Sequence, residues 1–211
     1  MKKIENLLPL VRPYYNGTDP AHDWAHVCRV AANAEKLVIG LELNTECVLA
    51  AVYCHDLINL PKNHPDRAQA SNLSREESLP LLRSCGFSEE EIALIACAIL
   101  EHSYSKGLKP SCLEAAVVQD ADRLDALGAI GILRCAAVNA QMKSTFYDPL
   151  DPLADKRSLD DKSFMLDHYF EKLYRLPELM NTQRAKIMAH ERVEVMKTFV
   201  EQLMQEISSC G

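Results

Sequence analysis

Apolar residues recur along most of the chain with the spacing of one face of an α-helix. The clearest stripe lies near the C-terminus: Met196, Phe199, Val200, Leu203 and Ile207. No pair of alternating stretches joined by a hairpin turn occurs. The pattern therefore predicts an all-α protein.

Capping residues, prolines and glycines divide this pattern into helices. We expect them near residues 2–14, 20–38, 45–56, 75–86, 89–103, 112–138, 161–176 and 182–208, with a further helix entered at Pro65. Pro9 and Pro80 should interrupt or kink their helices. Residues 144–162 are expected to be irregular. The helix over 112–138 contains Gly128 and Gly131, which suggests close approach of neighbouring helices.

Side-chain N-caps explain where several of these helices begin, because a short polar side chain can accept a hydrogen bond from a free backbone amide. The expected caps are Asp19 followed by Pro20, Asn44, and three capping boxes, Ser74 with Glu77, Ser88 with Glu91 and Ser111 with Glu114.

With 211 residues, of which 48% are apolar, the chain is long enough for one well-buried core. We expect a single domain over 1–211, with 163–208 as a C-terminal helical pair packed on the core and closing over the site. The net charge of -7 argues against a nucleic-acid polymer as partner. The start lacks a secretory signal and no run reaches transmembrane length, so we expect a cytoplasmic protein with no membrane partner. The eight isolated cysteines fit reduced thiols in the core.

The stretch 118–128 places Asp120, Asp122, Asp125 and Arg123 inside an otherwise apolar run. Burying carboxylates is costly unless a cation or a full set of hydrogen bonds receives them, and one arginine cannot match three acids. A bound metal could compensate them.

Two other stretches offer ligands that such a metal would accept, His22 to Val30 and the pair His55-Asp56. On the helix over 20–38, His22, His26, Arg29 and Asn33 would form one polar stripe, which an ordinary solvated face would also explain. The pair His55-Asp56 ends a predicted helix, where the partial negative charge of the helix favours a cation.

Imidazole and carboxylate ligands from three helices suit a divalent ion such as Mn²⁺, Fe²⁺, Co²⁺ or Ni²⁺, with Mg²⁺ or Zn²⁺ as further options. Positions left open on such an ion could take a water molecule and a phosphoryl oxygen, which is what hydrolysis of a phosphate ester requires.

The order His26, His55-Asp56, Asp122 resembles the HD-domain superfamily of metal-dependent phosphohydrolases. More specific still, His22-Asp23-x-x-His26-x-x-Arg29-Val30, the HD pair leading to Lys62-Asn63-His64-Pro65, and Asp120-Ala121-Asp122-Arg123-Leu124 before Gly128-Ala129-Ile130-Gly131 resemble the small stand-alone bacterial members. The likeness covers nearly the whole chain.

The resemblance implies His26, His55, Asp56 and Asp122 as metal ligands. Asp120 and Asp125 are rivals of Asp122, which is preferred because it holds the family's position before Arg-Leu. Several related hydrolases carry a carboxylate shortly after the HD pair, where this chain has Asn59. General acid or base duty then falls to the metal-activated water itself, His22, His102 or Glu101.

The expected substrate is a small phosphorylated metabolite, with a nucleotide favoured, cleaved at a phosphomonoester or pyrophosphate bond. Its phosphates would be bound by Arg29, Lys62, His64, Arg67 and Lys162, the last in the Asp160-Asp161-Lys162 turn at the hinge of the closing helices. An ordinary surface loop would explain residues 59–67 equally well.

Two other functions fit the same residues. Some members of the wider superfamily resemble di-iron oxygenases, and Glu101 with His102 could complete a second metal position. A nucleotide-binding regulatory module with little turnover is the other alternative, although such a module has no need of an open-sided metal. The chain should act as a monomer or homodimer.

Overall fold

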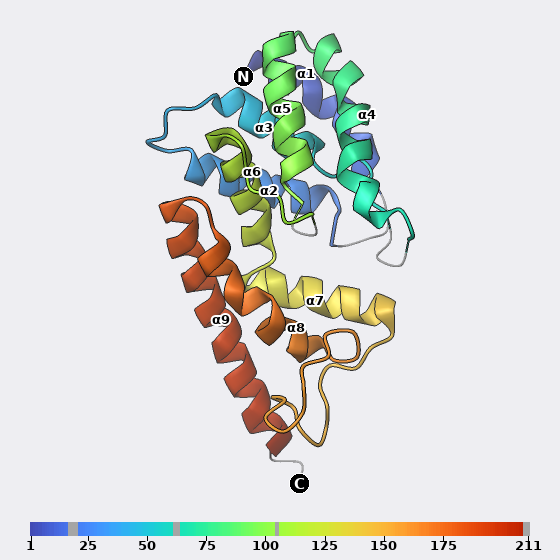
Figure 1. Cartoon of the computed structure of the whole chain (residues 1–211), viewed down its shortest axis with the longest axis vertical. Coiled ribbons are helices and arrows are strands. Elements are labelled where there is room, and N and C mark those ends of the chain that lie inside the picture. The colour runs from blue at the N-terminus through green and yellow to red at the C-terminus, as the bar shows by residue number, and fades with distance from the viewer. Residues whose placement is uncertain (17–20, 61–63, 104–105, 209–211) are drawn as a thin grey trace. The chain divides into compact units, whose positions relative to one another are not determined.

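The computed structural model describes residues 1–16, 21–60, 64–103 and 106–208 (Figure 1). Within these ranges the regular structure is helical, and the only β-type pairing is an isolated bridge between Thr145 and Phe164. The prediction of an all-α protein is confirmed.

The chain divides into two compact units, Met1–Asp122 and Arg123–Gly211. The boundary falls within α6 (Leu113–Asp125), so this helix carries the chain from one unit into the other. The expectation of one domain with a packed C-terminal pair stays a prediction.

The first unit is built around α3 (Thr45–Cys54), which contacts α1 (Lys2–Val11), α2 (Trp24–Leu37), α4 (Ala70–Ser84) and α5 (Glu89–Glu101). Seven of its ten residues are buried, since a helix surrounded by neighbours must be apolar on nearly every side. Two short 3₁₀ helices, η1 (Arg12–Tyr15) and η2 (Arg67–Gln69), complete the described elements before α6. The HD pair therefore lies at the end of the core helix.

The second unit contains α7 (Gly128–Met142), α8 (Met165–Glu171), η4 (Leu173–Leu179) and α9 (Gln183–Ser208). The long α9 packs on α7 and η4, and its buried residues include Val193, Met196 and Val200. Residues 144–162 form no helix, as expected. Arg157 holds this segment, because its guanidinium pairs with Asp148 at 3.3 Å and with Asp167.

The helix expected over 112–138 is broken into α6 and α7, so that prediction is wrong. Gly128 adopts a φ of +71°, a conformation that costs L-residues energy and stops α6 from continuing. A Cβ on Gly128 would also lie 3.3 Å from the side chain of Arg192, and one on Gly131 would lie 2.3 Å from the carbonyl oxygen of Ala126. The glycines thus permit a sharp junction and close contacts around it.

Two of the expected caps are confirmed. The Asn44 side chain accepts a hydrogen bond from the Cys47 amide (3.1 Å), and Ser88 with Glu91 forms a complete capping box on α5. Asp19 and Pro20 lie outside the described residues. The described helix α2 begins instead after Asp23, whose carboxylate accepts from the His26 amide at 2.8 Å.

The capping boxes at Ser74 and Ser111 are wrong. Ser74 lies inside α4, and its hydroxyl bonds the backbone of Ile58. Ser111 donates to Glu101, while Cys112 supplies the acceptor for the amide of Ala115, in the first turn of α6. The Ser74 hydroxyl is thus used by a tertiary partner, and the neighbouring Cys112 takes the place of Ser111 as the cap.

The two prolines do not end their helices. Pro9 lies inside α1 and Pro80 inside α4, and both helices continue beyond them. Pro80 is in the second half of α4, and the helix ends only at Ser84, before Gly86 at a φ of +82°.

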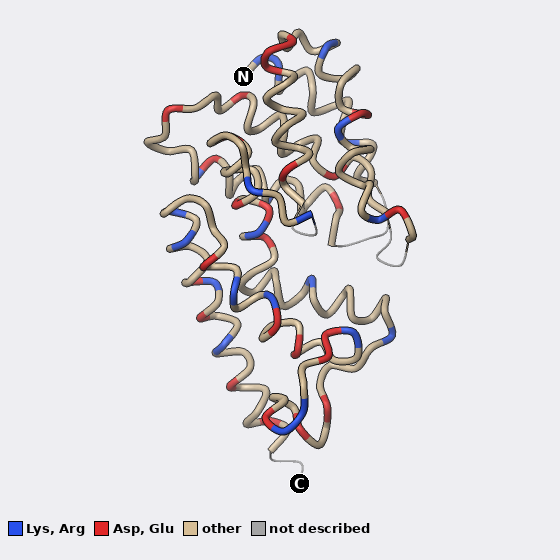
Figure 2. Tube along the Cα trace, viewed as in Figure 1, with Lys and Arg blue, Asp and Glu red and all other residues tan. Residues whose placement is uncertain are grey.

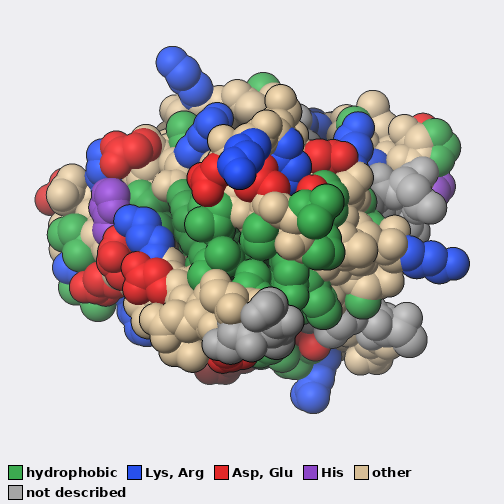
Figure 3. Space-filling model, turned by 90° about the horizontal axis from the view of Figure 1, so that it is seen from below, with side chains coloured by type: hydrophobic (Ala, Val, Ile, Leu, Met, Phe, Trp, Pro, Cys, Tyr) green, Lys and Arg blue, Asp and Glu red, His purple; other side chains and the backbone are tan. Residues whose placement is uncertain are grey.

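Lys and Arg are interspersed with Asp and Glu along the chain trace (Figure 2). On the face shown in Figure 3, charged side chains of both signs surround an apolar area, and no broad basic surface is seen there. Within the described part of the chain, no helix combines the length and hydropathy needed to cross a bilayer.

Candidate metal centre

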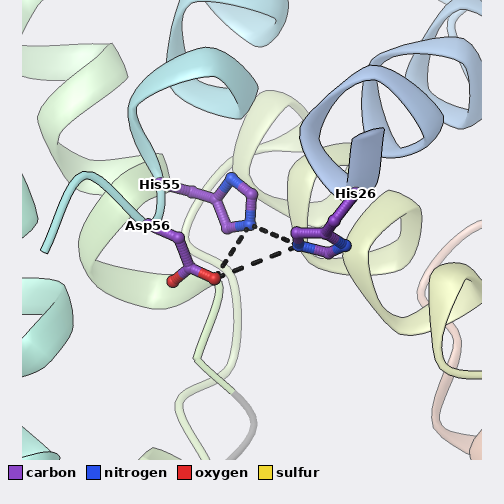
Figure 4. Close-up of side chains that lie close together, drawn as sticks. All are labelled: His26, His55 and Asp56. Atoms are coloured by element: carbon purple, nitrogen blue, oxygen red, sulfur yellow. Dashed lines mark hydrogen bonds and ion pairs between the residues drawn. The ribbon is translucent and has the colours of Figure 1, made fainter. Parts of the chain in front are cut away.

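His26, His55 and Asp56 point toward one another from two helices of the first unit (Figure 4). His26 lies in the first turn of α2, which begins there because Asp23 caps the His26 amide. His55 ends α3, and Asp56 follows it. Both imidazoles are fully buried. One ligand atom from each of the three residues lies within 4.8 Å of the other two.

The separations of the ligand atoms fit coordination by one ion. The two Nε2 atoms of His26 and His55 are 3.3 Å apart, and Asp56 Oδ2 lies 4.0 Å and 3.5 Å from them. Ligands held about 2.1 Å from one metal are about 3.0 Å apart at right angles and about 4.2 Å apart when opposite. The group could therefore hold a divalent metal ion after small adjustments.

Asp122 on α6 extends this group. Its Oδ1 lies 3.7 Å from His26 Nε2 and 3.9 Å from His55 Nε2. Asn33, buried on α2, donates to the carbonyl oxygen of Ala121 at 3.1 Å. This bond ties the helix of His26 to the helix of Asp122, so the two candidate ligands keep their mutual position. We call His26, His55, Asp56 and Asp122 the metal-binding group, since together they could hold an ion.

Backbone carbonyl groups set the tautomers of two histidines. His55 Nδ1 donates to the carbonyl oxygen of Val52 and His102 Nδ1 to that of Ile99, both at 2.6 Å. Because a carbonyl oxygen can only accept, the proton resides on Nδ1 in each neutral ring. His55 Nε2 is then left with its lone pair facing the carboxylates, as metal binding requires.

The electrostatics of the group favour the protonation states that a metal needs. Burial lowers the pKa of His55, outweighing the nearby charge of Asp56. Burial alone would raise the pKa of Asp56, but the imidazoles of His55 and His102 hold it well below its usual range. The pKa of Asp122 is lowered for the same reason, chiefly by His55 and His26 against the effect of burial. The chain thus presents a neutral imidazole and two carboxylates.

His102 lies at the outer side of Asp56. It follows α5 as the C-cap residue, is 6% exposed, and places Nε2 3.6 Å from Asp56 Oδ1, the oxygen turned away from His26 and His55. Burial would lower the pKa of His102, but the hydrogen bond and charge of Asp56 raise it above its usual value. His102 can therefore hold a proton beside the metal-binding group.

The other two candidates for acid or base duty, His22 and Glu101, lie in different environments. The ring of His22 lies 5.8 Å from that of His26, centroid to centroid, in an edge-on contact. His22 precedes α2, so the expected helical stripe begins only at His26. The Glu101 carboxylate accepts hydrogen bonds from the backbone amide (2.8 Å) and hydroxyl (3.1 Å) of Ser111, and this fixes the loop before α6.

The residues expected to bind phosphate occupy different environments. Arg29 is half-buried one turn beyond His26 on α2. Arg67 donates to Asn59 Oδ1 at 2.7 Å and to the carbonyl oxygen of Leu60, so it closes the loop after the HD pair. His64 Nδ1 accepts from the amide of Asp66 at 3.1 Å.

The remaining two phosphate candidates are not among the described residues of the first unit. Lys62 lies outside the described residues. Lys162 is an exposed residue of the second unit, in the turn where its amide donates to Asp160 Oδ1 at 3.2 Å.

Of the rivals to Asp122, Asp125 pairs with Arg134 at 2.8 Å and is 1% exposed. Asp120 is fully buried two residues before Asp122, which places it about 200° around α6 from that ligand. Asp122 reaches both imidazoles in the structure.

Sequence reasoning missed two residues that support the site. Ser74 accepts from the amide of Ile58 at 3.0 Å and so anchors the turn after the HD pair to α4. Asn33 was read as part of a polar stripe, whereas it is buried against α6. Neither partner is close in sequence, so no local pattern could have revealed these bonds.

Comparison with known proteins agrees with this geometry. A model of the HD domain matches residues 23–127, a range that includes the whole metal-binding group. The YpgQ protein of Bacillus subtilis is 31% identical over 98% of this chain and 95% of its own length. The chain belongs to the HD-domain superfamily.

Solved structures give the same result. An HD-superfamily hydrolase from Bacillus thuringiensis is similar with a TM-score of 0.73 and 33% identity, over 97% of this chain and 96% of its own. The crystal structure of Bacillus subtilis YpgQ in complex with ADP is similar with a TM-score of 0.73 and 28% identity, over 98% of this chain and 97% of its own.

Proposed function

We propose that this protein is a metal-dependent phosphohydrolase that cleaves a phosphomonoester or pyrophosphate bond of a nucleotide. The observation that carries the proposal is the convergence of His26, His55, Asp56 and Asp122 on one point of the first unit, with interatomic distances of 3.3 to 4.0 Å between the imidazole nitrogens and their neighbours. The ADP complex of the relative YpgQ supports a nucleotide as the ligand.

Each side chain has a separate task in this proposal. His26 and His55 supply nitrogen ligands from rings whose positions are set by the start of α2 and by the Val52 carbonyl group. Asp56 and Asp122 supply anionic oxygen ligands. A divalent ion bound there would acidify a water ligand and polarise a phosphoryl oxygen.

His102 is the proposed proton donor to the leaving group. Its Nδ1 is committed to the Ile99 carbonyl group, so the proton that it can exchange is on Nε2, the atom beside Asp56. Glu101 is not assigned this role, because its carboxylate accepts hydrogen bonds from Ser111. His22 remains the alternative, since its ring contacts that of His26.

The test begins with metal analysis of the purified protein, followed by a screen for release of phosphate or pyrophosphate from a panel of nucleotides with Mn²⁺. Asp56→Ala should remove both metal and activity while the helical content stays unchanged. Asp66→Ala is the matched control, because that carboxylate is 70% exposed and its Oδ2 lies 4.0 Å from His64 Nδ1. Absence of metal-dependent release from every phosphate ester would refute the proposal.

The position of His102 gives the di-iron oxygenase alternative its one supporting observation, since Nε2 and Asp56 Oδ1 could share a second ion. Iron analysis and oxygen consumption separate the two functions. Two iron ions per chain with oxygen uptake would favour the oxygenase, and one metal ion with phosphate release would favour the hydrolase. Tight nucleotide binding that survives Asp56→Ala would instead indicate the regulatory module.

A further inference from the structure

Lys106 is a partly buried cation a short distance beyond His102. It follows α5, and its amide donates to the carbonyl oxygen of Ser103 at 3.2 Å, which closes a turn. Its Nζ donates to Asn72 Oδ1 at 2.9 Å. Asn72 lies in the first turn of α4, the helix that packs against α5 (Figure 1). The ammonium group is thus held between the start of α4 and the end of α5.

No carboxylate compensates this ammonium group within the described part of the chain. Its side chain donates instead to the neutral amide of Asn72. Burial lowers the pKa of Lys106, and the like charge of Arg75 lowers it further. A half-buried lysine without an acid is costly, because the protein replaces only part of the hydration that the charge loses. A bound anion would supply the missing charge.

Arg75 is a second cation whose charge acts on Lys106. It lies three residues after Asn72 on α4, so the two side chains share one face of the helix. Its guanidinium pairs with the neighbouring Glu76, which is 58% exposed and therefore well screened by water. Lys106 and Arg75 are thus like charges close enough to repel each other, and a phosphate group could bind both.

The position of this pair along the chain suits a polyphosphate. Lys106 is four residues from His102, whose Nε2 is 3.6 Å from Asp56. Four extended residues span at most about 14 Å, and the turn at Ser103 shortens this distance. This limit is short enough for one ligand with several phosphate groups to reach both the metal-binding group and Lys106, which a monophosphate could not do with its single phosphate.

We propose that Lys106, with Arg75 beside it, binds a phosphate group remote from the metal-binding group and so gives nucleoside di- and triphosphates preference over monophosphates. This rests on the proposed function for the identity of the substrate, but it concerns binding alone. Lys106 is then a specificity-determining residue, and the Asn72 amide orients its ammonium group in the absence of ligand.

The test compares the dissociation constants of ADP and AMP by titration calorimetry at one Mn²⁺ concentration, with phosphate release followed in the same samples. Lys106→Met keeps the aliphatic stem and removes the charge. It should weaken ADP binding about tenfold or more and AMP binding less than twofold, because a charge-assisted hydrogen bond is lost only with ADP. Lys106→Arg should restore most of the ADP affinity.

Lys109→Met is the matched control, an exposed lysine of the same loop, and should leave both constants unchanged. An unchanged ratio of ADP to AMP affinity in Lys106→Met would overturn the proposal, as would a wild-type protein that binds the two nucleotides equally. Failure of the proposed hydrolase would appear separately, as wild-type protein that binds ADP and releases no phosphate from any nucleotide.

Discussion

Ser74→Ala tests whether α4 supports the metal-binding turn. The fully buried Ser74 hydroxyl accepts from the Ile58 amide at 3.0 Å and reaches the Ile58 carbonyl oxygen at 3.4 Å. Ile58 lies two residues after Asp56. The Ser74 side chain therefore bonds both the amide and the carbonyl group of Ile58. Its removal leaves a partly buried amide without a partner.

Ser78→Ala is the matched control for this change. Ser78 is also fully buried on α4, but its hydroxyl donates only to the Arg75 carbonyl oxygen of its own helix, at 2.6 Å. Loss of such a bond has little effect, because that oxygen lies within the helix and the bond competes with helical geometry. The two variants therefore differ mainly in the contact to Ile58.

An unsatisfied buried amide costs about 1–3 kcal/mol, so Ser74→Ala should lower the free energy of unfolding by about 2 kcal/mol and Ser78→Ala by less than about 0.5 kcal/mol. For a chain of this length, about 2 kcal/mol corresponds to a decrease in Tm of about 4–8 °C. Metal affinity should also fall about tenfold in Ser74→Ala, as loss of outer support for ligands commonly does.

Chemical denaturation with and without Mn²⁺, and competition with a chelator, measure these effects. If the two variants lose equal stability, the bond to Ile58 does not contribute to the fold as argued. If Ser74→Ala is destabilised but binds metal as tightly as the wild type, the turn does not depend on α4 for its geometry.

Three further predictions concern the second unit and the pH dependence. Asp125→Ala should destabilise the protein by about 3–5 kcal/mol, because it removes the buried carboxylate that pairs with Arg134. Denaturant titration measures this loss, and the variant should keep full metal occupancy. Gly131→Ala should destabilise by about 2 kcal/mol or more, since its Cβ would lie 2.3 Å from a backbone oxygen, and an unchanged Tm would contradict the contact. In metal-free protein, the raised pKa of His102 contributes stability below pH 6.5 that is lost as pH rises through the folded pKa. The stability advantage of wild type over His102→Gln should therefore shrink as pH rises above 6.5, and an advantage that grows would refute the sign of the shift.

Local sequence patterns were enough to predict the helical class and much of the site. The apolar repeat identified most of the helices, and Asn44 and Ser88 cap α3 and α5 as expected, because an N-cap bond involves residues only three apart. The pair His55-Asp56 was predicted at a helix end for the same local reason. These features depend on interactions within one or two turns of helix.

Features that depend on distant partners were decided only by the tertiary structure. Ser74 resembles a cap in sequence but bonds Ile58, and Asn33 resembles a surface residue but bonds the Ala121 carbonyl group across 88 positions. The break at Gly128 required its positive φ and the contact with Arg192, neither of which a helical repeat contains. The sequence by itself determined which residues could bind a metal and on which helices they lie. The packing of α2, α3 and α6 decided that Asp122 reaches the two imidazoles while Asp125 pairs with Arg134, because rotation of a helix about its axis is set by its neighbours.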